Sequence, residues 1–77
     1  MTTVELLEKI IDLKIKLENT KYKGKNIKIL RATNVIKLLY RENNKTYVIC
    51  FIDINSGNVY YKKNIYGNIN NYNKLIL

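Results

Sequence analysis

The hydrophobic period of the chain changes once, and this change limits the possible folds more than any other feature of the sequence. Leu6, Ile10, Leu13 and Leu17 follow one another at intervals of three or four residues, which is the period of one helix face. Between residues 26 and 63, apolar and polar side chains alternate instead, as they do in half-buried strands. A helical segment followed by strands predicts an α+β fold, with an N-terminal amphipathic helix packed on a three- to four-stranded antiparallel meander.

The first segment, residues 1–20, contains signals for both ends of the helix. Thr2 and Glu5 fit a capping box, in which a hydroxyl and a carboxylate each bind an early backbone amide. Asn19 and Thr20 form helices poorly and precede a charged turn that contains a glycine, so we expect the helix to end there. Two i,i+4 ion pairs of favourable order are expected on the solvent side: Glu5–Lys9 and Asp12–Lys16.

Three further apolar residues, Val4, Leu7 and Ile11, lie beside the main stripe of the helix. They widen the apolar face beyond the narrow seam of a coiled coil. We therefore expect the helix to lie across a sheet and to bury the wider face.

The strand-like region divides into segments at turn signals. NIKILR and VIKLLYR are separated by ATN, which should bend or interrupt the strand, and ENNK and NSG are turns by composition. TYVICFIDI, residues 46–54, is apolar on both faces and is expected to be the central strand. NVYYKK is expected to be the last strand.

The last segment, residues 64–77, reads as a polar, Asn-rich tail with an apolar end. Leu75, Ile76 and Leu77 either dock on the core of their own chain or are held by a partner, and the sequence leaves both possibilities open. A chain of 77 residues has room for one thin core. We expect a single domain over residues 1–77, with the helix at 1–20, the antiparallel meander at 26–63 and the polar tail at 64–77.

The net charge of +8 is concentrated in the middle of the chain. Residues 1–20 carry −1, residues 21–45 carry +7 and residues 46–77 carry +2. Ile, Lys, Asn and Tyr make up 43 of the 77 residues, and all four can be encoded by codons of A and T alone, as in a very AT-rich genome. Such a codon bias should spread lysine evenly, so it explains the total charge better than the concentration of charge in residues 21–45.

Histidine is absent and Cys50 is the single cysteine, which excludes several kinds of site. Ser–His and Cys–His nucleophile pairs, His-bound zinc, cysteine metal clusters and intramolecular disulfides all need residues that this chain lacks. The six acids form no catalytic or metal-binding pattern. We therefore expect a protein that is not an enzyme and needs no cofactor or metal, with Cys50 as a buried hydrophobic side chain.

The segment DINSG, residues 53–57, has the spacing that opens a calcium-binding loop. The twelfth position of such a loop is Asn64 here instead of a bidentate glutamate, and the surrounding residues are strand-like. A hairpin turn with Gly57 at positive φ explains the same residues better.

The longer segment YVICFIDINSGNVYY, residues 47–61, is similar to a hairpin of small uncharacterised phage and viral proteins, F-[IV]-D-x-x-[ST]-G-[DN]-[IV]-[YL]. Those proteins continue with a stretch that contains Trp and Pro, and this chain has neither residue there. The resemblance implies a viral origin, and it implies no reaction and no binding site.

Basic and aromatic residues alternate over the expected sheet. If the helix covers one face, Lys28, Lys37 and Arg41 should point onto the other face, together with apolar side chains. Nucleic-acid-binding sheets combine cations that contact phosphates with aromatic rings that stack on bases. The candidate nucleic-acid-binding residues are Lys21, Tyr22, Lys23, Lys25, Lys28, Arg31, Lys37, Tyr40 and Arg41. The same alternation continues through Tyr47, Tyr60, Tyr61, Lys62 and Lys63.

These features predict a small basic non-enzymatic protein of a virus, phage or mobile element that associates with nucleic acid with little sequence specificity. The alternative is a protein-binding module, either a minor virion component or a host-factor inhibitor, whose basic surface meets an acidic protein and whose tail joins a larger assembly. A solvated lysine-rich face with half-buried tyrosines would explain the same residues without binding. We expect a soluble protein of the host cytoplasm or the virion with no membrane partner, since no apolar run approaches the ~20 residues of a membrane span.

Overall fold

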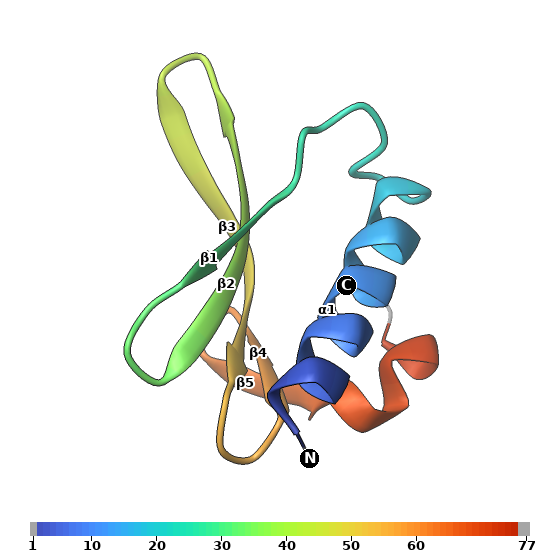
Figure 1. The fold of residues 1–77 in the computed structure, drawn as a ribbon. Coiled ribbons are helices and arrows are strands. Elements are labelled where there is room, and N and C mark those ends of the chain that lie inside the picture. Colours follow the sequence, from blue (N-terminus) through green and yellow to red (C-terminus); the bar gives the residue numbers. More distant parts are fainter. Residues whose placement is uncertain (1, 76–77) are drawn as a thin grey trace.

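A computed structural model describes residues 2–75, in which one α-helix lies against a five-stranded antiparallel sheet (Figure 1). The strands follow the order β1-β2-β3-β4-β5, so each strand pairs with the next one along the chain. The α+β prediction is confirmed, although the sheet has five strands and not the three to four expected. The elements are α1 (Thr3–Glu18), β1 (Lys28–Arg31), β2 (Val35–Glu42), β3 (Lys45–Asp53), β4 (Asn58–Tyr61), β5 (Asn64–Asn68) and the 3-10 helix η1 (Ile69–Lys74).

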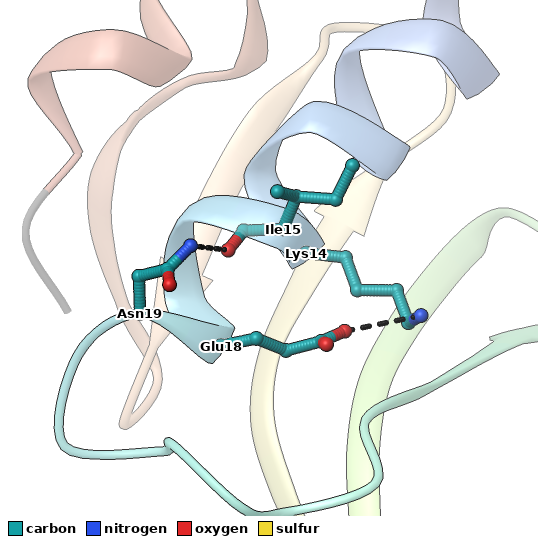
Figure 2. A network of polar contacts seen from close by, with 4 residues as sticks. All are labelled: Lys14, Ile15, Glu18 and Asn19. Carbon is teal, nitrogen blue, oxygen red and sulfur yellow. Dashed lines mark hydrogen bonds and ion pairs between the residues drawn. The ribbon is translucent and has the colours of Figure 1, made fainter.

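Local side-chain contacts fix both ends of α1. The Thr2 hydroxyl accepts a hydrogen bond from the Glu5 amide at 3.1 Å, as the capping prediction requires. At the other end, Figure 2 shows the Asn19 side-chain amide donating to the Ile15 carbonyl oxygen at 3.0 Å. It also shows Lys14 and Glu18 paired at 3.1 Å. The helix is therefore two residues shorter at each end than the predicted 1–20.

One hydrophobic core joins α1 to a single face of the sheet. Leu6, Ile10, Leu13 and Leu17 of the helix are all at most 4% exposed, which confirms the predicted stripe. The sheet contributes the side chains that the two-residue period assigned to that face, and the last segment adds two more. These residues are Ile36, Leu38, Cys50, Ile52 and Val59, with Ile69 and Leu75 from the last segment.

The expectation that Val4, Leu7 and Ile11 are buried is wrong. Their side chains are 64%, 40% and 45% exposed. The reason is that α1 packs against η1 as well as against the sheet. The buried stripe therefore points between the sheet and η1, and the opposite flank of the helix faces solvent.

The expected tail over 64–77 is also corrected by the structure. Residues 64–68 form β5, whose Gly67 pairs with Val59 of β4, and residues 69–74 form η1. Leu75 is 4% exposed, so it docks on the core of its own chain. Ile76 and Leu77 lie outside the described residues.

Two lysines of α1 attach this last segment to the helix. The Lys9 ammonium donates to the Asn70 side chain at 2.6 Å. The Lys16 ammonium donates to the Tyr72 carbonyl oxygen at 3.1 Å and also to the Asn73 carbonyl oxygen. The predicted Glu5–Lys9 and Asp12–Lys16 pairs are therefore wrong, because both lysines reach the last segment instead.

The face of the sheet opposite α1 carries no helix within residues 2–75 (Figure 1). Strand pairing sets its side chains in rows, because residues paired across strands point to the same face. We call this surface the open face. It comprises Leu30, Lys37, Phe51, Tyr60 and Ile65 in one row, Lys28, Leu39 and Val48 in the next, and the pairs Arg41–Thr46 and Val35–Asp53 at the two ends. The prediction that Lys28, Lys37 and Arg41 point away from the helix is confirmed.

The predicted turns lie where composition placed them. The Asp53 carboxylate accepts hydrogen bonds from the Asn55 and Ser56 amides at 2.8 and 2.9 Å, which lowers the pKa of Asp53. Gly57 has φ +77°, so the segment DINSG is a hairpin turn. No helix among the described residues is long and apolar enough to cross a membrane.

Candidate nucleic-acid interface

The β2–β3 hairpin extends beyond the end of β4 and leaves a corner beside it (Figure 1). In the part of the chain that the structure describes, β3 pairs with β4 only at Phe51 and Ile52, so Lys45–Cys50 extends further than β4. A cavity of about 280 Å³ lies at this corner. It is lined by Tyr22, Tyr40, Tyr47, Val48, Ile49, Phe51, Tyr61, Lys62 and Lys63, and we call it the tyrosine cavity.

Four tyrosines from three separate parts of the chain line the tyrosine cavity. Tyr22 belongs to the linker after α1, Tyr40 and Tyr47 face each other on β2 and β3, and Tyr61 ends β4. The Tyr40 and Tyr47 rings are stacked, with centroids 5.2 Å apart, and Tyr22 lies 6.1 Å from Tyr40 at a tilt of 57°. Tyr47 is 42% exposed, so part of this aromatic surface is open to solvent.

Lysines lie over three of the four rings. The Nζ-to-centroid distances are 5.3 Å for Lys21–Tyr22, 5.4 Å for Lys25–Tyr40 and 5.4 Å for Lys62–Tyr61. These distances are within the range of cation–π contacts. Lys25 also pairs with Glu42, and this hydrogen bond raises the pKa of Lys25. None of the described residues that line the cavity is acidic.

The backbone at Lys62 and Lys63 is in the left-handed region, with φ of +50° and +69°. The same arrangement occurs at Asn43 and Asn44, at the tip of the β2–β3 hairpin, with φ of +54° and +63°. Asparagine tolerates this region and glycine favours it, whereas lysine pays a steric penalty there. Two strained lysines therefore form one rim of the tyrosine cavity.

Burial is the main cause that raises the pKa of Tyr22 above its ordinary value, and the neighbouring Tyr61 and Tyr40 hydroxyls add to it. A neutral ring next to ammonium groups can stack on a flat π-system while the lysines contact an anion.

The structure divides the predicted site residues among three places. Lys21, Tyr22, Lys25 and Tyr40 come together at the tyrosine cavity. Lys23 is exposed in the same linker. The pairing of the strands places Lys28, Lys37 and Arg41 on the sheet side that faces away from α1, where the Lys37 ammonium lies 5.8 Å from the centre of the Phe51 ring.

Arg31 lies apart from the other predicted residues. It pairs with the buried Ile36, on the side of the sheet that faces α1. There it lines a second cavity, of about 180 Å³, beside the first turns of the helix. The other lining residues are Thr3, Leu6, Leu7, Ile29, Ile36 and Ile54. The nine predicted residues therefore do not form one continuous patch.

Two tyrosines and two lysines of the cavity were not among the candidates: Tyr47, Tyr61, Lys62 and Lys63. The alternation of basic and aromatic residues included all four, so this signal could have found them. The sequence did not show that residues near position 62 lie beside Tyr22, because the hydrogen-bonded pairing of β3 with β4 creates that proximity.

Cys50 lies in the core and not at either cavity. Its side chain is 1% exposed, and burial raises the pKa of its thiol to about 12. Within residues 2–75, no three His, Cys, Asp or Glu side chains are grouped closely enough to hold a metal ion.

Comparisons with protein-family models, with curated proteins and with solved structures give no match to this chain. The resemblance of residues 47–61 to phage and viral hairpins therefore stays a prediction.

Proposed function

We propose that this chain is a small basic non-enzymatic protein that binds single-stranded nucleic acid with little sequence specificity. The observation that supports the proposal best is the gathering of four tyrosines around one cavity that lysines border. At about 280 Å³, the tyrosine cavity is just below the ~300–1,000 Å³ of drug-sized ligand sites, which suits one nucleobase. A base would stack on the rings while four lysines contact the flanking phosphates: Lys21, Lys25, Lys62 and Lys63.

The chemistry of the cavity favours binding without base selection. Stacking tolerates every base, since each base has a π-face. Reading a base edge needs hydrogen-bonding groups held in fixed positions. No polar side chain is fully buried among the described residues, so nothing rigidly holds such a group against the base. A paired duplex would keep its bases out of the cavity, so single strands should bind more tightly than duplexes.

The test is a titration of fluorescent single-stranded and duplex oligonucleotides at two salt concentrations, followed by anisotropy. With Lys21, Lys25, Lys62 and Lys63 on phosphates, log K against log salt should have a slope of about −3 for single strands. Absence of binding at low salt would refute nucleic-acid binding. Equal affinity for duplex and single strand would refute the role of the cavity.

A tyrosine variant tests the cavity directly. Tyr47→Leu keeps an apolar side chain but removes one stacking ring, and it should lose about 1–3 kcal/mol of binding free energy. Tyr60→Leu is the control, because Tyr60 lies on the open face and does not line the cavity. Tyr47→Phe should bind as the parent does. Equal losses from Tyr47→Leu and Tyr60→Leu would show that no stacking site exists at the cavity.

The source and the location of the protein belong to the same proposal. An amino-acid composition rich in A/T-encoded residues supports a virus, phage or mobile element with an AT-rich genome. We place the protein in the host cytoplasm or the virion, where it would meet single-stranded nucleic acid.

A second candidate function is supported by a different observation. Apolar residues are exposed on the outer flank of α1 and on the open face of the sheet, as expected of a surface that meets another protein. A protein-binding module, as a minor virion component or a host-factor inhibitor, would use these surfaces. Isolation of the protein from its native source, with identification of bound protein and nucleic acid, separates the two candidates.

A further inference from the structure

The outer flank of α1 carries an apolar stripe that the fold does not use. Val4, Leu7, Ile11 and Ile15 are 64%, 40%, 45% and 54% exposed. Their spacing places them on one side of the helix, roughly 135° around the axis from the buried stripe. Rows of exposed apolar side chains of this kind mark interaction sites. We call these four residues the outer stripe.

The open face is a second exposed apolar surface, on the other side of the molecule. Leu30, Val48, Phe51 and Ile65 on this face are 51%, 40%, 36% and 64% exposed. Leu39 is 8% exposed but does not belong to the core cluster beneath α1, since it points to the open face. Within residues 2–75, the sheet therefore has α1 on one face and an apolar surface that no helix covers on the other.

The two surfaces have opposite charge. The outer stripe is bordered by the exposed acids Glu8 and Asp12, and Lys14 at its end is already paired with Glu18 (Figure 2). The open face carries Lys28, Lys37 and Arg41, with Asp53 at one end, so its charge is positive. The segments that hold the two surfaces differ in the same sense, with −1 over residues 1–20 and +7 over residues 21–45.

We propose that the outer stripe of one copy packs on the open face of a second copy of this chain. The contact would repeat the packing inside the molecule, where α1 already covers the other face of the same sheet. A stable interface buries about 800 Å² on each partner, which is about a seventh of the 5298 Å² surface of the described residues. The two patches are sufficiently exposed and extended to contribute to such an interface.

The arrangement of the two surfaces determines the kind of assembly. They belong to opposite layers of one molecule, so a contact between them leaves a free stripe at one end and a free open face at the other. A head-to-tail contact of this type adds copies without closing into a dimer. The contact also joins opposite charges, so high salt should weaken it.

Complementary variants test this arrangement without nucleic acid, so the result does not depend on the proposed function. Ile11→Lys places a positive charge on the outer stripe, and Leu30→Glu places a negative charge on the open face. Each variant alone should raise the dissociation constant of self-association by about tenfold or more. An equimolar mixture should recover association, because the intact outer stripe of Leu30→Glu meets the intact open face of Ile11→Lys and the two substituted surfaces carry opposite charges. Sedimentation velocity over a concentration series measures both outcomes.

Three results would overturn the proposal. The parent chain could stay monomeric at the highest concentration and low salt. Leu30→Glu alone could still form dimers, which would show that two outer stripes pack on each other. The mixture could remain monomeric. Circular dichroism checks that each variant is folded. If either variant fails to fold, Val4→Lys and Ile65→Glu form a second pair, at the most exposed apolar position of each surface.

Discussion

The turn at Lys62 and Lys63 allows fold stability and the proposed nucleic-acid binding to be changed in opposite directions. Both residues have positive φ, at +50° and +69°. The double substitution Lys62→Asn with Lys63→Gly installs the residue pair that this hairpin geometry prefers. It also removes two charges from the rim of the tyrosine cavity.

The stability change follows from the backbone. A non-glycine residue in the left-handed region is disfavoured by about 1–2 kcal/mol, and asparagine and glycine relieve most of this penalty. The greater freedom of glycine in the unfolded chain offsets about 0.4–1 kcal/mol of the gain. We expect the free energy of unfolding to rise by about 1 kcal/mol, and Tm by about 4–8 °C in a domain of this size. Urea and thermal unfolding followed by circular dichroism measure the two values.

The binding change should have the opposite sign. Loss of two phosphate contacts should make the slope of log K against log salt shallower by about 1.4 for a single strand. Affinity at low salt should fall with it. The matched control, Lys62→Arg with Lys63→Arg, keeps both the charge and the backbone penalty, so it should change neither stability nor the salt slope.

Two outcomes would contradict this reasoning. Unchanged or lower stability in the Asn–Gly variant would show that the turn is not strained. A more stable variant that binds with the parent's salt slope would show that the rim lysines do not contact the phosphates.

Three further predictions concern the core. The thiol of Cys50 should resist iodoacetamide in the folded protein at pH 8 and react in urea, and labelling at equal rates in both states would contradict its burial. Because the folded state raises the pKa of this thiol from 9.0 to about 12, its contribution to stability is complete below pH 9 and is lost as the pH rises towards 12, which urea unfolding at several pH values can follow. Gly67→Ala should reduce the free energy of unfolding by about 1–3 kcal/mol, because the added Cβ would lie 2.5 Å from a methyl carbon of Leu75. Unchanged stability would show that Leu75 can move aside freely.

The parts of the fold that local signals specify could be predicted from the sequence. The helix, its Thr2 cap and the central strand depend on residue spacing within short windows, and all three are found where they were expected. The turns at 43–44 and 53–57 carry Asn, Asp and Gly, which favour those backbone conformations.

The fifth strand could not be predicted because its turn lacks such a signal. Lys62 and Lys63 are unusual turn residues, and the segment after them is Asn-rich with little apolar alternation. The attachment of η1 to α1 could not be predicted either. Lys16 binds Tyr72 and Asn73, which are more than 50 positions away from it in the sequence.

The candidate site could be predicted only in part. Tyr22 and Tyr40 could be selected as aromatic residues among lysines, and both line the cavity. Arg31 was selected on its charge, but the strand alternation turns it towards α1. A count of charges cannot distinguish these cases, whereas the two-residue period already separates Arg31 from Lys28 and Leu30.

Codon bias remains the competing explanation for every lysine in this chain. A comparison of the residues at the β2–β3 and β4–β5 turns tests this explanation. Asparagine and lysine are both encoded by A/T-only codons, and the chain contains 12 of each, so the bias supplies them equally. The β2–β3 turn uses two asparagines at positive φ, which its backbone tolerates well. The β4–β5 turn has the same backbone with two lysines, although asparagine was equally available and fits better. Backbone strain persists in proteins mainly where a site uses it. The lysines at this turn therefore need a reason other than composition, and a phosphate at the rim of the tyrosine cavity provides one.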